Sequence, residues 1–435
     1  MKTPDRRPAP FYYPAPLQPR HRHASWQYGT KKAGQRIIAT AVRKERAKVP
    51  NNLPPPPGEW DGPPGTWEGP PGWFDGPPGS WEGPPGLASG APVKGLGCLP
   101  DVPDHRDRTF ERFATEFEKQ KGKLTEEAAA AFGLDHLSCL TGHWTEWQGQ
   151  LAGLGAKLEN RFHLGDLLDE AGAPRRLLPP IEDQGPVNSC SAHAVIGLVE
   201  YLVRAGGGEA LDLSRLFLYK LSRMLDGSEG NTGTYLRSAF KALRLFGVPP
   251  EDYWPYAPEL LDAEPQALQF AWAGNWKSTS YYRLDQDGFS GADTLNLMRL
   301  VLADRFPVAM GFSLFQSISQ IGPDHVIPFP DGREGADRQL GSHAVLAVGY
   351  DDEVEVTSPC PVTPPVSAPA RKGKKKSNGE RTAALEKQRG ALIVRNSWGP
   401  EWADWGYAYL PYRYVLDRLV VDCWTVLKAD SLPAT

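Results

Sequence analysis

Four polar residues, far apart in the chain, have the side chains that nucleophilic chemistry at a carbonyl group requires. Cys190 stands at the start of a predicted helix, where the helix dipole and free backbone N–H groups favour a thiolate. His343 begins an apolar strand and could hold the thiolate as an ion pair and later protonate a leaving amine. Asn396 ends the next predicted strand and could orient the imidazole, while Gln184, six positions before Cys190, could donate to an oxyanion. Singly each is more often structural, but together they predict a thiol site.

Trp398 follows the orienting amide by two positions, in the sequence Asn-Ser-Trp-Gly. Its indole could lie over a hydrogen bond between His343 and Asn396 and keep water away from it. The ordinary alternative is a tryptophan of the hydrophobic core. We therefore expect Trp398 to support the site and not to take part in bond making.

The segments around these residues predict the elements that must hold them. Helices are expected over 189–208, 213–225 and 234–247, and strands over 307–314, 342–351, 391–397 and 407–412. Because the helices come first and the strands follow, the pattern predicts an α+β fold and not alternating βαβ units. Cys190 would then lie on a helical part, and His343 and Asn396 on neighbouring strands.

The first part of the chain has a composition unlike that of packed protein. The whole sequence has 45 glycines and 43 prolines among its 435 residues. Residues 1–53 predict a basic, proline-rich disordered tail. Residues 54–96 contain a seven-residue repeat of the form Gly-x-Trp-acidic-Gly-Pro-Pro, which predicts an extended linker. The repeat is either a spacer or a multivalent segment that presents aromatic–acidic units to an unknown partner.

The rest of the chain divides into a leading segment with a helical region over 97–175 and a compact domain over 176–428. Helices are expected over 110–132 and 138–172. Within the compact domain, residues 352–390 are proline-rich, then lysine-rich, with no apolar period. They predict a disordered insertion between two strands.

The overall composition excludes several classes of protein. The net charge is −4, so no nucleic-acid partner is expected for the compact domain from bulk charge. No run of about 18 apolar residues predicts a membrane span, and the first residues lack the apolar core of a secretory signal. The five cysteines are scattered and odd in number, which is not a disulfide framework. We therefore expect a cytoplasmic protein. No cluster of His, Cys and carboxylate residues has the spacing of metal ligands, so neither a metal nor a cofactor is implied.

Several motifs, taken in order, resemble those of the papain-like cysteine peptidases, including bacterial members. The three strongest read DQGPVNSCSAHA (183–194), HAVLAVGYDD (343–352) and NSWGPEWADWGYAYL (396–410). Weaker counterparts are EGNTGTYLRSAFKAL (229–243), DYWPY (252–256), RFPVAMGF (305–312) and the leading PDVPDHRD (100–107). The resemblance covers about 178–412, and the motif near residue 100 places that segment within the catalytic unit.

The resemblance implies a fold and a set of roles. The fold would have a helical subdomain and an antiparallel, β-rich subdomain with the active-site cleft between them. Cys190, His343 and Asn396 would be the catalytic residues, and Gln184 would contribute to the oxyanion hole. The implied activity is that of a cysteine-type endopeptidase, and no metal or cofactor takes part.

The resemblance also implies where substrate binds. A peptide or protein substrate would lie extended along Thr232, Gly233 and Thr234, in the glycine-containing segment before the third helix. Two alternatives share the same motifs. One is a transpeptidase or ligase, in which an amine and not water receives the acyl group. The other is a catalytically silent scaffold whose N-terminal repeat binds a partner.

Four positions depart from the family pattern. Val187 stands where secreted members have a cysteine, which agrees with a reducing compartment. Asn188 replaces a glycine, and we expect it to take a backbone conformation that asparagine tolerates better than most residues. Ser191 replaces the usual tryptophan after the nucleophile, and Ala403 replaces a glycine of the last motif.

Overall fold

The computed structural model describes residues 94–104, 107–110, 112, 144–169, 172–277, 280–330, 337–357 and 387–426. Several predictions lie outside these ranges: the tail 1–53, the repeat 54–96 except for its last three residues, nearly all of the helix expected over 110–132, and positions 358–386 of the insertion. The described residues belong to one compact unit.

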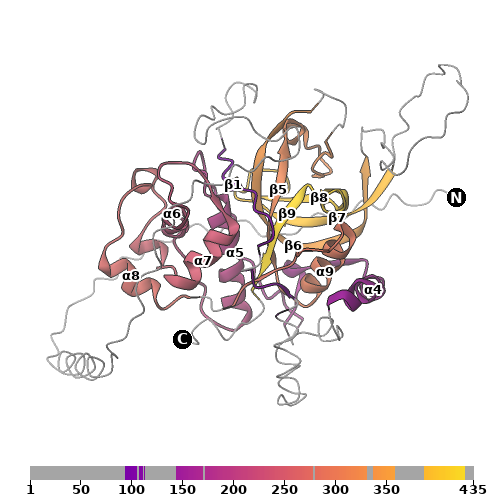
Figure 1. The fold of residues 1–435 in the computed structure, drawn as a ribbon, viewed down its shortest axis with the longest axis horizontal. Helices are drawn as coiled ribbons and strands as arrows, with labels where there is room; N and C mark the ends of the chain where they lie inside the picture. Colours follow the sequence, from indigo (N-terminus) through magenta and orange to yellow (C-terminus); the bar gives the residue numbers. More distant parts are fainter. Residues whose placement is uncertain are drawn as a thin grey trace, which may run out of the picture. The chain divides into compact units, whose positions relative to one another are not determined.

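Helix α5 (Cys190–Ala205) is the central element of the helical lobe. Every residue from Cys190 to Val203 is buried, so this helix is enclosed on all sides and not amphipathic at a surface. It packs against α6 (Arg215–Asp226) and α7 (Leu236–Leu245) on one side and against the sheet on the other (Figure 1). The lobe also contains the shorter α8 (Ala267–Ala273).

The second lobe is built on a sheet that has seven strands within the described residues. Its order is β4 (Tyr282–Arg283), β9 (Val420–Thr425), β5 (Val308–Phe315), β6 (Gln339–Thr357), β7 (Lys387–Arg395) and β8 (Tyr407–Pro411), with β2 (Arg161–His163) also paired to β6. All pairs in this sheet are antiparallel. The predicted α+β architecture, with helices before strands, is therefore confirmed.

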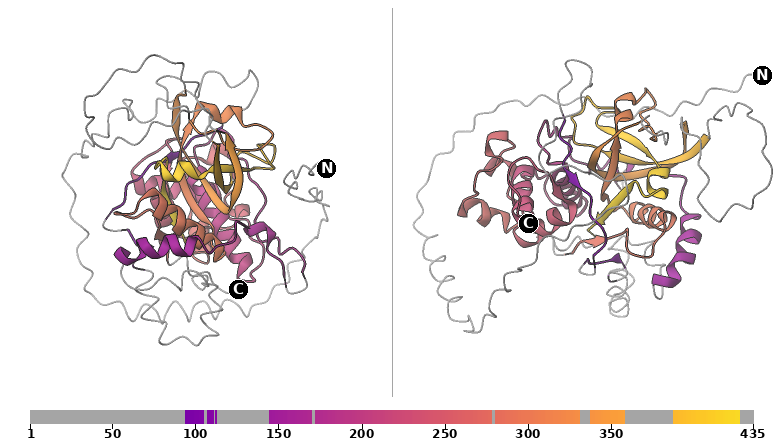
Figure 2. Two further views of the ribbon diagram at one scale, coloured as in Figure 1. Left: turned by 90° about the vertical axis from the view of Figure 1, so that its right-hand side faces the viewer. Right: turned by 45° about the horizontal axis from the view of Figure 1, so that its top comes forward.

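Further helices cover the sheet lobe. These are α4 (Trp144–Gly155), α9 (Gly291–Ala303) and α10 (Tyr412–Leu416), with α9 packed against both of the others and against β6. Figure 2 shows the helical lobe and the sheet side by side with α5 between them. Single-turn helices occur at Leu164–Asp166, Glu251–Tyr253, Pro258–Leu260 and Gln316–Gln320.

Two local predictions need correction. Strands β6 and β7 extend into the expected insertion, where Glu355, Val356 and Thr357 pair with Arg389, Gln388 and Lys387. The insertion is predicted because residues 352–390 lack an alternating apolar pattern. Backbone hydrogen bonds can continue a ladder without that pattern once the register of the two strands is fixed. The helix expected over 138–172 ends at Gly155, and β2 follows it, with Phe162 opposite Tyr350 of β6.

The leading segment is packed on both lobes and is not a separate domain. Its strand β1 (Cys98–Leu99) pairs in parallel with β3 (Thr234–Tyr235), just before α7. Cys98 is buried, as is Phe110 farther along. Placement of the motif near residue 100 within the catalytic unit, implied by the resemblance, therefore agrees with the packing.

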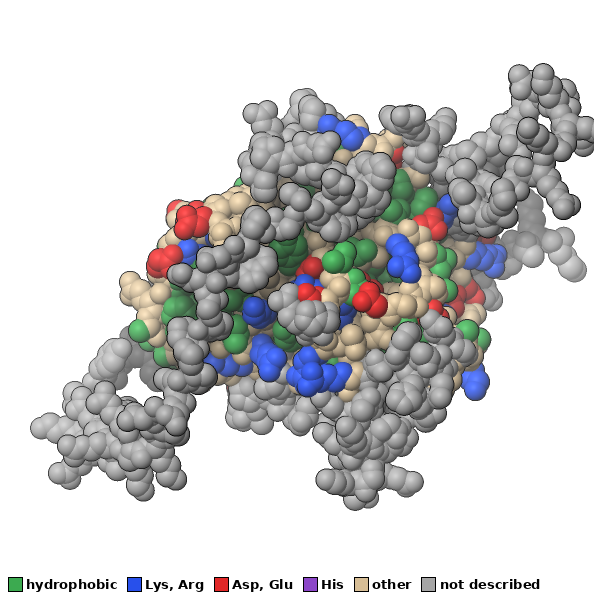
Figure 3. Space-filling view, viewed as in Figure 1, with side chains coloured by type: hydrophobic (Ala, Val, Ile, Leu, Met, Phe, Trp, Pro, Cys, Tyr) green, Lys and Arg blue, Asp and Glu red, His purple; other side chains and the backbone are tan. Residues whose placement is uncertain are grey.

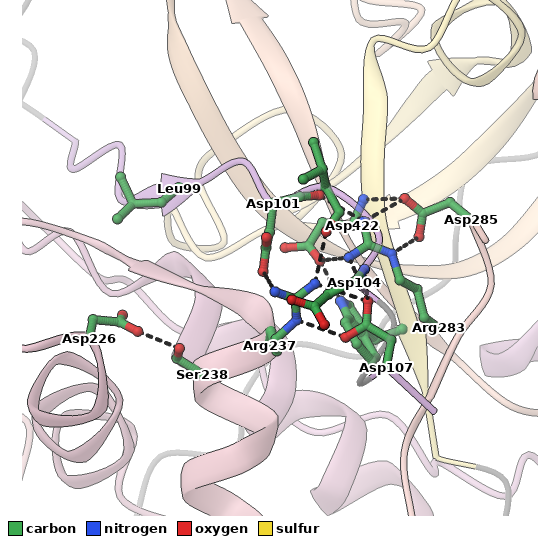
Figure 4. A network of polar contacts seen from close by, with 12 residues as sticks. Leu99, Asp101, Asp104, Asp107, Asp226, Arg237, Ser238, Arg283, Asp285 and Asp422 are labelled. Atoms are coloured by element: carbon green, nitrogen blue, oxygen red, sulfur yellow. Dashed lines mark hydrogen bonds and ion pairs between the residues drawn. The ribbon is translucent and has the colours of Figure 1, made fainter. Parts of the chain in front are cut away.

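A buried group of charges, the Asp–Arg cluster, holds the leading segment in place (Figure 4). Its members are Asp101, Asp107, Arg237, Arg283, Asp285 and Asp422. Arg237 of α7 reaches Asp101 at 2.7 Å and Asp107 at 2.8 Å. Arg283 of β4, fully buried, lies 3.4 Å from Asp107 and 3.0 Å from Asp285. The cluster thus joins the segment to both the helical lobe and the sheet.

Charges of both signs lie on the surface shown in Figure 3. Lysine and arginine side chains gather below its middle, with acidic and apolar groups interspersed above them. Among the described helices, none is long and apolar enough to cross a membrane.

We predict that Arg283→Met lowers the free energy of unfolding by about 3–5 kcal/mol, because it leaves buried carboxylates without their cation. Burial raises the pKa of Asp422 to about 8, so this carboxyl is largely protonated at pH 7.5, and the carboxylates that lose their cation are those of Asp107 and Asp285. Equilibrium urea unfolding at pH 7.5, followed by tryptophan fluorescence, measures the loss. The matched control is Arg389→Met, whose 3.6 Å pair with Glu355 is exposed and should contribute at most about 1 kcal/mol. Equal losses in the two variants would contradict this account of the cluster.

Candidate active site

Cys190 is the first residue of α5 and faces the sheet. Its Sγ accepts a hydrogen bond from the backbone N–H of Ala344 on β6, at 3.5 Å. The side chain is completely buried. The position at a helix start was predicted, and the contact with β6 places the thiol beside the residue that follows His343.

His343 and Asn396 meet through the pairing of β6 with β7. His343 lies on β6, opposite Phe312 of β5, and Asn396 directly follows β7. The ring Nε2 of His343 is 2.7 Å from Oδ1 of Asn396. The backbone N–H of Ser397 also donates to that Oδ1, at 2.8 Å, which identifies the atom as the amide oxygen. Since an amide oxygen only accepts, Nε2 of His343 carries the proton and Nδ1 keeps a lone pair.

Burial keeps the imidazole of His343 neutral. The ring is fully buried, with Trp398 at 4.6 Å between ring centroids and Phe312 at 6.0 Å. This burial lowers the pKa of His343 to about 4, although the hydrogen bond to Asn396 opposes the shift. Among the described residues, Nδ1 of His343 has no hydrogen-bond partner, and no bond joins it to the thiol of Cys190. Trp398 is therefore in contact with the ring of His343, while its expected position over the His343–Asn396 bond stays a prediction.

Gln184 is tied to the same strand end by Ser397. The hydroxyl of Ser397 donates to Oε1 of Gln184 at 2.6 Å, and the backbone N–H of Gln184 donates to the carbonyl of Ser397 at 2.8 Å. Ser397 therefore contacts both Asn396 and Gln184, a role that sequence reasoning missed although the residue lies inside the recognised motif. The amide of Gln184 then has a fixed orientation, with Nε2 as the donor.

The donors of the site are occupied by the chain itself, at residues 94–99. Nε2 of Gln184 donates to the carbonyl of Gly95 at 3.0 Å and to that of Val187 at 2.7 Å. The backbone N–H of Thr234 donates to the carbonyl of Gly97 at 2.8 Å. We call residues 94–99 the cleft segment, because they lie between Gln184 on one side and β3 on the other.

The cleft segment fits only because it is rich in glycine. A Cβ at Gly97 would lie 1.8 Å from the backbone oxygen of Asn188, and one at Gly95 would lie 2.3 Å from that of Val187. From the opposite wall, a Cβ at Gly233 would meet the carbonyl of Gly97 at 2.5 Å. Backbone therefore packs directly on backbone, and no side chain can be added at these points without displacing the segment.

The predicted thiolate is not the state of Cys190 beneath this cover. Burial raises the pKa of the thiol, and N–H groups of Ala344 and Gly97 offset this only in part. Desolvation thus outweighs the helix dipole that motivated the prediction. Both the thiol of Cys190 and the imidazole of His343 are therefore uncharged beneath the cleft segment.

Two of the three predicted substrate-binding residues contact the cleft segment. Gly233 and Thr234 both touch the cleft segment, as described above, and the N–H of Gly233 donates to the hydroxyl of Tyr219 at 3.0 Å. The hydroxyl of Thr232 instead faces its own chain and donates to the carbonyl of Gly233 at 3.4 Å. Across the described ranges, no group of three or more metal-ligating side chains is arranged around an ion site.

The departures from the family pattern have different local reasons. Asn188 has no positive φ, contrary to expectation; its backbone N–H and side-chain amide instead bond Asn231 at 2.6 and 2.7 Å. Of these four positions, Ala403 is the one with a positive φ, at 48°. The hydroxyl of Ser191 donates to the carbonyl of Thr234 at 3.1 Å and so helps to hold β3.

Comparisons with known proteins agree with this geometry. A sequence model of the papain family of cysteine proteases matches residues 169–415. The chain belongs to the papain family of cysteine proteases. For this part of the chain, membership gives a cysteine peptidase with a papain-like α+β fold, as the motifs had indicated.

Individual relatives are distant. An uncharacterized peptidase C1-like protein of Acanthamoeba polyphaga mimivirus is 27% identical over 255 residues, covering 57% of this chain and 70% of its own length. Cathepsin K of Gallus gallus is 26% identical, covering 53% of this chain, which spans about half (54%) of the length of that relative. The crystal structure of xylellain, a cysteine protease from Xylella fastidiosa, shares the fold with a TM-score of 0.50 and 23% identity, covering 77% of this chain and 96% of its own.

We predict that Gly97→Ala in the full chain exposes the thiol of Cys190, because the added Cβ cannot fit against Asn188. Alkylation of Cys190 by iodoacetamide, followed by peptide mass spectrometry, should become about tenfold faster or more. Cys98 should become reactive together with it, while the fully buried Cys423 on β9 should not. The control is Gly153→Ala on α4, where a Cβ would have no atom within 4 Å. Unchanged labelling in the Gly97 variant would show that the segment does not limit access.

We also predict that His343→Gln makes the folded protein less sensitive to acid. The folded pKa of about 4 lies below the ordinary value of His, so the unfolded chain binds more protons as the pH falls below about 6.5. Stability that depends on neutral His343 is therefore present at pH 7.5 and lost toward pH 4. Between pH 7.5 and 5, the variant should lose about 2 kcal/mol less than the wild type in urea unfolding. Parallel losses would mean that the ring is solvated in the folded state.

Proposed function

We propose that the protein is a cysteine endopeptidase in which Cys190 is the nucleophile and His343 is its base and acid. The observation that carries the proposal is the hydrogen bond of Ser397 to Asn396, since it fixes the tautomer of His343 and leaves Nδ1 as an unpaired base in the buried site. A base with a free lone pair beside a thiol is what nucleophilic catalysis requires.

The proposed reaction begins when the cleft segment leaves and a substrate peptide takes its place along Thr232, Gly233 and Thr234. His343 Nδ1 accepts the proton of Cys190, and the thiolate attacks the carbonyl carbon of the scissile bond. Release of the burial that raises the thiol pKa favours this transfer. The substrate would use the backbone N–H of Thr234, which now bonds Gly97.

The negative charge that develops on the carbonyl oxygen would be stabilised by Nε2 of Gln184 and the backbone N–H of Cys190. Collapse of the tetrahedral intermediate breaks the carbon–nitrogen bond, and His343 gives its proton to the leaving amine. Water, activated in turn by His343, then hydrolyses the thioester and restores the thiol. Asn396 orients the imidazole throughout, and Trp398 shields their hydrogen bond.

The test is cleavage of a library of internally quenched peptides by the full chain, compared with Cys190→Ala and Asn396→Ala. We expect internal cleavage by the wild type, none by the Cys190 variant, and a rate about 10–100-fold lower for the Asn396 variant, because the amide only orients the ring. Mass spectra of products formed with an added amine separate hydrolysis from acyl transfer to that amine. Products trimmed only from peptide ends, or unchanged turnover without Cys190, would contradict the proposal.

A further inference from the structure

A chain of hydroxyl groups lies behind the loop that joins Gln184 to Cys190. The hydroxyl of Tyr256 is 2.6 Å from Oγ of Ser189 and donates to the backbone carbonyl of Gln184 at 2.9 Å. Ser189 and Gln184 are completely buried, and Tyr256 is half-buried in the segment after α7. The three groups therefore bridge the two ends of a loop of only a few residues.

The protons in this chain can be assigned from its end groups. The backbone carbonyl oxygen of Gln184 can only accept a hydrogen bond, so the hydroxyl of Tyr256 is the donor and uses its single proton in that bond. Burial raises the pKa of Tyr256, so the phenol keeps that proton at any working pH. The hydrogen bond between Ser189 and Tyr256 must then use the proton of the serine. The order is Ser189 to Tyr256 to Gln184, in which the hydroxyl of Tyr256 both accepts and donates, so that the two hydrogen bonds strengthen each other.

His193 agrees with this assignment. Burial lowers its pKa to about 3, so the ring is neutral and one nitrogen carries a proton. Nδ1 lies 3.0 Å from the backbone carbonyl of Ser189, another pure acceptor, and 3.3 Å from the hydroxyl of Ser189. Nδ1 is thus the protonated nitrogen and cannot accept from the serine hydroxyl. The proton of Ser189 remains free for Tyr256.

Tyr256 is itself held from the helical lobe. Its backbone N–H donates to the carboxylate of Glu251, which lies 3.6 Å from Arg215 at the start of α6. Its ring meets the edge of His193 on α5 at 5.1 Å between centroids. Both the backbone and the ring of Tyr256 are therefore held by residues outside the loop that joins Gln184 to Cys190.

We propose that Tyr256 is a positioning residue for the oxyanion site. The proposal rests on the proposed function, in which one oxyanion donor belongs to Gln184 and the other is the backbone N–H of Cys190. The tyrosine hydroxyl binds the backbone of the first and the residue next to the second. It thereby sets the separation of the two donors, and donors help a transition state only when they are held at the position of the developing charge.

The test compares Tyr256→Phe with Tyr219→Phe in the full chain. Tyr219 is a matched control, because its buried hydroxyl accepts from Gly233 in the proposed substrate-binding segment and donates to Asn231 at 3.4 Å, whereas the hydroxyl of Tyr256 donates to Gln184. Tyr256→Phe should lower kcat about tenfold with KM nearly unchanged. Tyr219→Phe should chiefly raise KM. Thermal melting of both variants measures any general loss of packing.

Two probes separate positioning from a structural effect. A peptide aldehyde adds the Cys190 thiol across its C=O bond, forming a sulfur–carbon bond while the proton passes to the oxygen, which then lies at the oxyanion donors. Iodoacetamide alkylates the same thiol with loss of iodide and develops no oxyanion. Tyr256→Phe should weaken aldehyde binding about tenfold, in step with kcat, and leave the alkylation rate unchanged. Ser189→Ala should have a smaller effect, and the double variant should be no worse than Tyr256→Phe alone.

The possible outcomes distinguish a failure of this inference from a failure of the proposed function on which it rests. If the wild type neither cleaves peptides nor binds the aldehyde, the proposed function fails and the role of Tyr256 fails with it. If the wild type does both and Tyr256→Phe matches it, only the positioning role is overturned. Equal losses of aldehyde binding and of alkylation would also overturn it, since they would reflect general damage to the site.

Discussion

The register between β6 and β7 is the constraint on which the rest of the site depends. Leu346 pairs with Arg395, so His343 lies three residues before one member of the pair and Asn396 directly after the other. On its other side β6 is held by β5, with Phe312 opposite His343. Successive side chains of a strand point to opposite faces, and a slip of one residue would therefore turn His343 away from both Cys190 and Asn396. The long apolar pairing of these strands in the core gives that slip a large cost in free energy.

Ser397 extends this constraint from the sheet to the helical lobe. Its N–H selects the oxygen of Asn396 that faces His343, and its hydroxyl and carbonyl hold Gln184. Gln184 lies at the start of the loop that leads to Cys190. Ser397 alone therefore orients Asn396 at the end of the sheet strand and Gln184 before the helix. In a fully buried site each polar atom needs a partner of the right kind, and a chain of acceptors and donors then determines where every proton lies. Within the described residues, two buried atoms of the site have no hydrogen-bond partner: Nδ1 of His343 and Nε1 of Trp398.

Local features of the sequence predicted much of this arrangement, while features that depend on distant contacts were not predictable. The start of α5 at Cys190 and the strands bearing His343 and Asn396 follow from apolar pattern and motif. The position of the cleft segment does not, because Gly95 and Gly97 meet Val187, Asn188 and Thr234, about 90 to 140 positions away. Only the resemblance of PDVPDHRD to a family segment pointed to that region. Likewise, nothing in the residues of β2 marks them as a strand until β6 provides a partner.

Under the proposed function, the cleft segment and a substrate compete for the same hydrogen-bond donors. The cleft segment uses the amide of Gln184 and the N–H of Thr234, the same donors that the proposed substrate would use. Exchange of one set of backbone hydrogen bonds for another changes little free energy, because each donor is satisfied in both states. The difference must then come from outside the cleft, where Arg237 and Arg283 bind the aspartates that follow the segment. These ion pairs connect both lobes to residues 101–107 and so tether the segment next to Gln184 and Thr234. Under the proposed function, a tethered competitor has a high effective concentration.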